Sequence, residues 1–117
     1  VQTCALPISA SRRADIFFEF QNTADPRIIV AIPQTMSHGL NLTAASTIIW
    51  YGPPTSQEVY TQANGRVARP SQKNHMNIGH IVGSPRETEM YKGLKAGLKL
   101  QETLLAMYKV ELNTIQL

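Results

Sequence analysis

Residues 47–69 read TIIWYGPPTSQEVYTQANGRVAR, and this stretch decides the fold class. Thr47 to Tyr51 is a continuous apolar run rich in β-branched residues, typical of a strand buried on both faces of a parallel sheet. A Gly-Pro-Pro turn ends the run. Thr55, with Glu58 three residues later, predicts the capping box that begins a helix, and Pro70 predicts its end. A strand followed closely by a helix is the unit from which α/β domains are built.

The same alternation extends on both sides of this unit. Ser11 to Asn22 has the apolar spacing of a helix, and Arg27 to Ile32 predicts a second strand buried on both faces. Met76 to Val82 predicts a third strand. Ser84, followed by proline and glutamate, predicts the start of a long final helix that runs to about Leu112. We therefore expect an α/β domain with a mostly parallel sheet flanked by helices, ending in a long C-terminal helix.

Composition limits the class of protein. The chain has 117 residues, of which 43% are hydrophobic and 16% charged, enough for one compact soluble domain and not for two. A net charge of +3 is compatible with a nucleic-acid surface without demonstrating one. No apolar run approaches the roughly 20 residues that cross a bilayer. A single cysteine excludes an intrachain disulfide and a zinc site of several thiolates, so we expect a cytosolic protein without a metal site.

Residues 1–8, VQTCALPI, need separate treatment. The codons GTG CAG ACG TGT GCT CTT CCG ATC encode this string, and they match a common sequencing adapter translated in frame. We interpret the segment as adapter-derived and exclude it from the fold, as one excludes an expression scar. The alternative interpretation is a genuine short apolar strand. On the adapter interpretation, Cys4 is not native, and residues 9–117 are an N-terminally truncated, partial domain.

Three polar side chains on the helix after Thr55 have the chemistry of a phosphate site. Gln62, Arg66 and Arg69 are four and three residues apart, so a helix projects them from one side. The planar guanidinium donates two parallel hydrogen bonds to a phosphate and never deprotonates. An arginine aimed at a transferring phosphoryl group accelerates the reaction by roughly 10³ to 10⁵. Arginines at this spacing also form ordinary solvated helix faces, so the spacing alone leaves both interpretations open.

The sequence around these arginines resembles a known family. Gln62 to Arg69, QANGRVAR, is similar to motif VI of superfamily-two helicases, and Arg69 to Gln72 is similar to its continuation in Swi/Snf-type DNA translocases and related phage helicases. Upstream, Ser37 to Ala45, SHGLNLTAA, resembles motif V with its Gly-x-Asn-Leu core. With the elements between and around them, the resemblance runs from about Arg12 to Tyr108. It implies the C-terminal RecA-like half of an ATP-driven DNA helicase or translocase.

The resemblance implies a role for each matched residue. Arg66 and Arg69 would reach the γ-phosphate of ATP, with Arg69 as the better candidate for the arginine finger. Gln62 would order this interface, and Gly39 and Asn41 would approach the nucleotide. The predicted polar loop between the second strand and Asn41 would contact the DNA backbone through Gln34, Thr35, Ser37 and His38.

One departure from the family pattern lies in that loop. The family usually places a threonine or serine, followed by a polar or basic residue, where this chain has Pro33 and Gln34. Thr35 or Ser37 is then the hydroxyl available to contact a phosphate. Trp50 has the pattern of a core residue and not of a base-stacking platform.

The chain contains neither a Gly-x-x-x-x-Gly-Lys-Ser/Thr phosphate loop nor a strand-end Asp-Glu pair for magnesium. In the resembled family these belong to a first RecA-like domain, which would bind most of the ATP and Mg²⁺. The chain by itself is therefore not expected to hydrolyse ATP. The implied partners are DNA, with RNA not excluded, and that N-terminal domain, but no membrane. The style of the motif V segment favours a bacterial or phage source and a cytoplasmic location.

Two other interpretations remain open. The chain could be a basic nucleic-acid-binding α/β module without ATPase activity, which would bind DNA with salt-sensitive affinity. It could also be a doubly wound α/β domain whose arginines bind another phosphorylated ligand, which the fold alone would permit. A Walker-type loop in the upstream reading frame would favour the motor over both.

Overall fold

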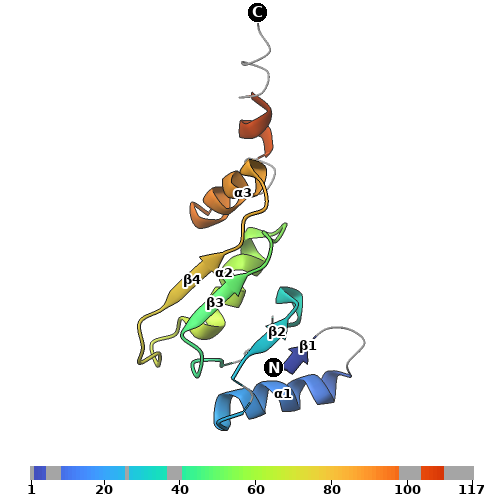
Figure 1. The fold of residues 1–117 in the computed structure, drawn as a ribbon, viewed down its shortest axis with the longest axis vertical. Helices are drawn as coiled ribbons and strands as arrows, with labels where there is room; N and C mark the ends of the chain where they lie inside the picture. The colour runs from blue at the N-terminus through green and yellow to red at the C-terminus, as the bar shows by residue number, and fades with distance from the viewer. Residues whose placement is uncertain (1, 5–8, 26, 37–40, 98–103, 110–117) are drawn as a thin grey trace, which may run out of the picture.

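The structure is a computed structural model that describes residues 2–4, 9–25, 27–36, 41–97 and 104–109. Strands and helices alternate along the chain, as predicted for an α/β domain (Figure 1). The elements are β1 (Gln2–Cys4), α1 (Ala10–Asn22), β2 (Ile29–Ala31), the 3-10 helix η1 (Pro33–Met36), β3 (Thr47–Trp50), α2 (Gln57–Val67), β4 (Asn77–His80) and α3 (Pro85–Lys95).

The strands form two parallel pairs. β1 pairs with β2, and β3 pairs with β4 in a register that sets Thr47 opposite Asn77 and Trp50 opposite His80. The parallel arrangement is the one predicted, although in the described part of the chain no hydrogen-bonded ladder joins the two pairs. Gln2–Cys4 therefore has the conformation of a short strand. That the segment derives from an adapter stays a prediction about the origin of the sequence.

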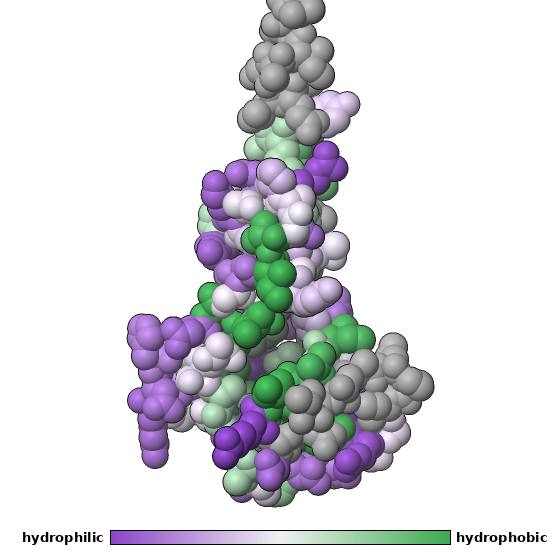
Figure 2. All heavy atoms as spheres, in the orientation of Figure 1, coloured by the Kyte–Doolittle hydropathy of each residue, from purple (hydrophilic) through white to green (hydrophobic). Residues whose placement is uncertain are grey.

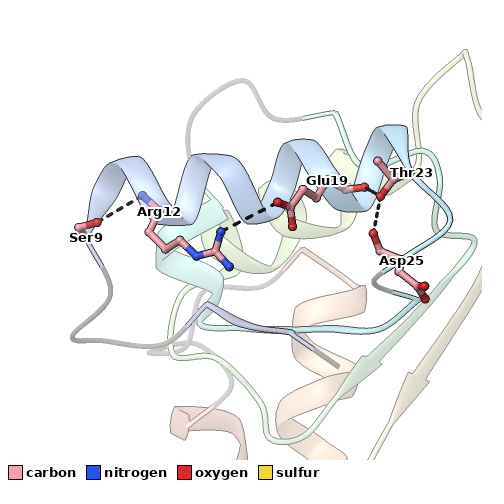
Figure 3. A network of polar contacts seen from close by, with 5 residues as sticks. All are labelled: Ser9, Arg12, Glu19, Thr23 and Asp25. Atoms are coloured by element: carbon pink, nitrogen blue, oxygen red, sulfur yellow. Dashed lines mark hydrogen bonds and ion pairs between the residues drawn. The ribbon is translucent and has the colours of Figure 1, made fainter.

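Helix α1 begins and ends with local polar contacts (Figure 3). Ser9 is the N-cap, and its hydroxyl accepts from the Arg12 N–H at 3.3 Å. At the other end, the Thr23 hydroxyl lies against the carbonyl oxygens of Glu19 and Asp25. Arg12 also forms an exposed ion pair with Glu19 at 4.0 Å, which contributes at most about 1 kcal/mol. These contacts define the length of α1, whereas its position depends on its apolar side.

Two groups of buried side chains hold the helices against the strands. The first comprises residues of α1 together with one residue from the segment before β3 and one from the end of α2: Ile16, Phe17, Phe20, Leu42 and Val67. The second joins β3, α2 and α3: Trp50, Tyr60, Ala63, Tyr91 and Leu94. Ile48 of β3 packs against both groups. The helix α2 is therefore anchored in two cores at once.

The other face of the strands is exposed, so the prediction that β2 and β3 are buried on both faces is wrong. Val30 is 52% exposed and Ile49 is 67% exposed, whereas Ile48 and Trp50 point towards the helices. Side chains alternate across a strand, and the described helices pack against only one of the two faces. Figure 2 shows apolar side chains gathered over the strands.

The start of α2 differs from the prediction by one residue. Ser56, and not Thr55, is the N-cap, because the Ser56 hydroxyl accepts from the Val59 N–H at 3.3 Å. The Glu58 carboxylate does not close a capping box and instead accepts a hydrogen bond from the Gln62 side chain at 3.0 Å. Both residues are accepted N-caps, with serine preferred over threonine, and the observed cap follows that preference.

The prediction of one long C-terminal helix is also wrong. α3 has the predicted serine cap, Ser84, but it ends at Lys95. Gly97 then adopts a φ of +75°, a left-handed conformation that favours glycine, and its N–H donates to the Leu94 carbonyl at 3.2 Å. Residues 104–109 are helical again, while the rest of the predicted helix, 98–103 and 110–112, lies outside the described residues.

Replacing Gly65 or Gly97 by alanine should change the free energy of unfolding in opposite directions. Gly97→Ala should lower the free energy of unfolding by about 1 kcal/mol, because an L-residue is strained at this φ. Gly65→Ala should raise it by about 0.5–1 kcal/mol, because Gly65 lies inside α2 and an added Cβ meets no atom within 4 Å. Urea denaturation of both variants measures the difference. A stabilised Gly97→Ala variant would contradict the helix stop.

Candidate functional site

The predicted phosphate-binding side chains lie at the C-terminal part of α2 and just beyond it. Gln62 is exposed on α2, and Arg66 is half-buried on its last turn. The prediction placed Arg69 on this helix as well. The helix ends at Val67, however, and Arg69 lies in the turn that follows. The Nε of Arg69 donates back to the Gly65 carbonyl at 3.3 Å, which keeps Arg69 beside the helix end.

Arg66 connects α2 to the loop after β2. Its Nε donates to the Met36 carbonyl at 2.9 Å, across 30 residues of sequence, and η1 packs against α2. The sequence predicted a polar loop here, whereas Pro33–Met36 forms a 3-10 helix closed by a hydrogen bond from the Thr35 N–H to the Ile32 carbonyl at 2.9 Å. A guanidinium that holds a loop carbonyl fixes that loop relative to the helix.

The predicted nucleic-acid residues are described only in part. Gln34 is exposed on η1. The Thr35 hydroxyl, which was a candidate phosphate contact, donates to the Ile32 carbonyl at 2.7 Å and so stabilises the 3-10 turn in this conformation. Ser37, His38 and Gly39 lie outside the described residues.

The segment that begins at Asn41 lies directly against α2. Asn41 is exposed, and its side-chain oxygen accepts from the Thr43 N–H at 3.3 Å, which forms a tight local turn. The next residue, Leu42, is buried, and its N–H donates to the Arg66 carbonyl at 2.9 Å. The structure therefore brings the motif V-like and motif VI-like segments into contact.

Two glutamines that the sequence analysis did not assign to the site hold this segment in place. Gln21 of α1 donates through Nε2 to the Thr43 hydroxyl at 3.1 Å and accepts through Oε1 from the Ala44 N–H at 2.9 Å. Gln72 donates to carbonyl oxygens of the same segment and of the α2 end. No pattern singles out Gln21. For Gln72, the family-like extension after Arg69 was the available signal.

An aromatic group secures the other side of α2. Trp50 is 5% exposed, which confirms the prediction of a core residue, and its Nε1 donates to Asn64 of the QANGRVAR segment at 3.0 Å. The Tyr60 hydroxyl pairs with His80 Nε2 at 3.0 Å, and the Tyr91 ring lies 4.4 Å from the His80 ring. β3 and β4 thus hold α2 through polar contacts as well as through apolar packing.

Two groups in this cluster have shifted pKa values. Burial lowers the pKa of His80 below its ordinary value, and the positive charge of Lys95 lowers it further. Burial also raises the pKa of Tyr91, with smaller contributions from the charges of Glu87 and Tyr60. Both shifts favour the neutral form of the side chain, as expected for groups packed among aromatic rings.

Comparison with known proteins agrees with this arrangement. Residues 5–71, more than half of the 117-residue chain, match the model of the helicase conserved C-terminal domain family. The chain belongs to this family. The matched range includes η1, the segment from Asn41 and the whole of α2, which are the parts that make up the candidate site.

A solved structure shows the same fold. The crystal structure of the C-terminal part of the Fun30 ATPase domain superposes with a TM-score of 0.66 at 20% sequence identity, over 78% of this chain. The chain spans only 30% of the length of that structure. This likeness confirms the predicted RecA-like α/β fold with a small parallel sheet and flanking helices. No curated protein matches the chain.

Two negative findings apply to the described residues only. They contain no group of three or more His, Cys, Asp or Glu side chains that could hold a metal ion. Every helix within the described ranges is too short or too polar to cross a membrane.

The lowered pKa of His80 predicts a pH-dependent stability. A folded-state pKa below the unfolded value of about 6.5 means that the stability from neutral His80 is fully present above that pH. It is lost as the pH falls towards the folded-state pKa. Urea denaturation between pH 8 and pH 5 should show this loss, and His80→Gln should reduce it. His75→Gln, at an exposed histidine, is the matched control and should leave the pH dependence as in the wild type.

Proposed function

We propose that this chain is the second motor domain of an ATP-dependent DNA helicase or translocase of the superfamily-two, Swi/Snf-like or phage type. It would share one ATP site with a first RecA-like domain of the same protein. The observation that carries the proposal is the hydrogen bond of 2.9 Å from the Leu42 N–H to the Arg66 carbonyl. This bond sets Asn41, which would contact the nucleotide near its ribose, beside the end of α2, where Arg66 and Arg69 lie.

Arg69 is the proposed arginine finger. An arginine finger stabilises the charge that develops on the γ-phosphate oxygens, and here the second domain would supply it to ATP bound by the first domain. Arg69 lies in a turn, and its Nε contact is with Gly65, only four residues away. Arg66 bonds a carbonyl 30 residues away and offers its own carbonyl to Leu42. The long-range contacts of Arg66 favour a role that combines a phosphate contact with support of the loop.

The remaining proposed contacts come from the resemblance to the helicase motifs. Gly39 and Asn41 would approach the nucleotide, and Gln62, which now bonds Glu58, would order the interface. ATP and Mg²⁺ would be held mainly by the first domain, where water attacks the γ-phosphate and ADP leaves. This chain would supply the positive charge and the precise placement of its own side chains.

The DNA backbone would contact the loop after β2, at Gln34, Thr35, Ser37 and His38. This placement is supported by the hydrogen bond from Arg66 of α2 to the Met36 carbonyl, which joins the end of η1 to α2. When ATP draws the two domains together, movement at the arginines would be transmitted to the DNA-contacting loop through this bond. Release of the products would then reverse the movement.

Arginine substitution tests the proposal. In the full-length protein, Arg69→Ala should lower the rate of DNA-stimulated ATP hydrolysis by roughly 10³-fold or more, since it removes charge stabilisation in the transition state. Arg12→Ala is the matched control, because Arg12 is an exposed arginine of α1 whose ion pair with Glu19 contributes little stability. The control should retain the wild-type rate. An unchanged rate in Arg69→Ala would remove the arginine-finger assignment.

The chain by itself provides a second test. It should show no ATP hydrolysis with or without DNA, because the groups that hold Mg²⁺ and orient water belong to the first domain. Binding of the isolated chain to DNA should weaken steeply with salt if the loop contacts phosphates. Salt-sensitive binding together with a full-length protein that does not hydrolyse ATP would instead favour a nucleic-acid-binding module without motor activity.

A further inference from the structure

Gln72 is tied to Arg69 through the backbone. Its N–H donates to the Arg69 carbonyl at 2.8 Å, which closes a four-residue turn with Pro70 at the second position. Proline suits this position because its fixed φ matches the turn. The turn reverses the chain directly after Arg69, so the Gln72 side chain lies against the end of α2.

The Gln72 side chain then joins two segments that are far apart in sequence. Its Nε2 lies 2.7 Å from the Ala45 carbonyl oxygen, 3.1 Å from that of Val67 and 3.3 Å from that of Thr43. Val67 is the last residue of α2, and Thr43 and Ala45 belong to the segment that begins at Asn41.

This environment requires an amide donor. The Gln72 Oε1 accepts from the Asn74 N–H at 3.1 Å, so the orientation of the amide is determined at both ends. A carboxylate at the same place has no hydrogen to share and would set its negative charge against carbonyl oxygens. An apolar side chain would remove this donor from the carbonyl groups of Thr43 and Ala45. It would also remove one of two donors to the Val67 carbonyl at the helix end, the other being the Arg69 N–H at 3.1 Å.

We infer that Gln72 is a positioning residue that sets the placement of Arg69 relative to the nucleotide-contacting segment at Asn41. The inference rests on the proposed function. The turn fixes Arg69 to Gln72, and the side chain fixes Gln72 to residues 43–45, so one residue connects both parts of the candidate site. A displacement of about 1 Å in such a placement can cost about 10²-fold in rate.

A role in stability alone predicts a different result. If Gln72 only caps α2, its loss lowers the melting temperature but leaves each folded molecule fully active. If it positions Arg69, the loss removes a contact that acts in the transition state. The maximal rate then falls, while the KM for ATP, set mainly by the first domain, stays the same.

The test uses the full-length protein with Gln72→Glu, assayed at least 15 °C below its melting temperature. We expect kcat for DNA-stimulated ATP hydrolysis to fall roughly ten-fold or more, with KM for ATP within about two-fold of wild type. Gln57→Glu is the matched control, because it makes the same change on the first turn of α2, where the Gln57 Nε2 donates to Thr61 at 2.7 Å. The control should keep the wild-type kcat.

The outcomes separate this inference from the proposed function. A normal kcat in Gln72→Glu, with Arg69→Ala inactive, overturns the role of Gln72 and leaves the proposed function standing. A normal kcat in Arg69→Ala removes the arginine-finger assignment from the proposed function, and the inference about Gln72 falls with it. If Gln72→Glu does not fold, Gln72→Asn keeps the amide, shortens its reach by one methylene and is assayed in the same way.

Hydrogen exchange checks the structural half of the inference without ATP. In Gln72→Glu, the backbone N–H groups of Leu42 and Ala45 should exchange faster than in the wild type, because the segment loses its attachment to the turn that follows α2. Exchange in Gln57→Glu should be unchanged. Wild-type exchange at Leu42 and Ala45 in Gln72→Glu would overturn the inference, whatever the rate of ATP hydrolysis.

Discussion

The hydrogen bond from the Leu42 N–H to the Arg66 carbonyl is the contact on which the candidate site depends. It joins two segments that the chain separates by β3 and a turn. Leu42 is buried among the apolar residues of α1, and Val67, next to Arg66, is buried in the same group. The bond is therefore held on both sides by apolar packing. An exposed hydrogen bond contributes little, whereas one fixed between two buried side chains determines geometry.

Glutamine and arginine side chains extend this connection outward. Gln21 bonds Thr43 and Ala44, Gln72 bonds carbonyls on both sides of the junction, and Arg66 bonds the end of η1. Most of these contacts are made to backbone groups of the irregular segments, whereas Gln21 donates to the Thr43 hydroxyl and accepts from the Ala44 N–H. Loops of this kind need such partners, because half-buried backbone groups are costly when unpaired. The polar contacts thus stabilise the irregular segments while the two apolar groups stabilise the regular ones.

Periodicity predicted the regular elements well, because it reports which face of an element is apolar. The helix over Ser11 to Asn22 became α1, and each predicted strand contains an observed one. The errors occur where periodicity says nothing. It could not choose between Thr55 and Ser56 as a cap. It did not show that Gly97 takes a left-handed φ and ends α3. The continuous apolar run around Ile49 predicted burial on both faces of the strand, but the face that carries Ile49 is exposed.

The sequence by itself determined the class of the domain, the order of its elements and the helix that carries Gln62 and Arg66. These are local properties, set by side-chain spacing, turns and recognisable motifs. Only the tertiary structure decided that Arg66 holds the Met36 carbonyl and that Gln72 connects Val67 to residues 43–45. Those contacts link residues up to 30 positions apart. They follow from how α1, α2 and β3 pack together, and no local pattern encodes that packing.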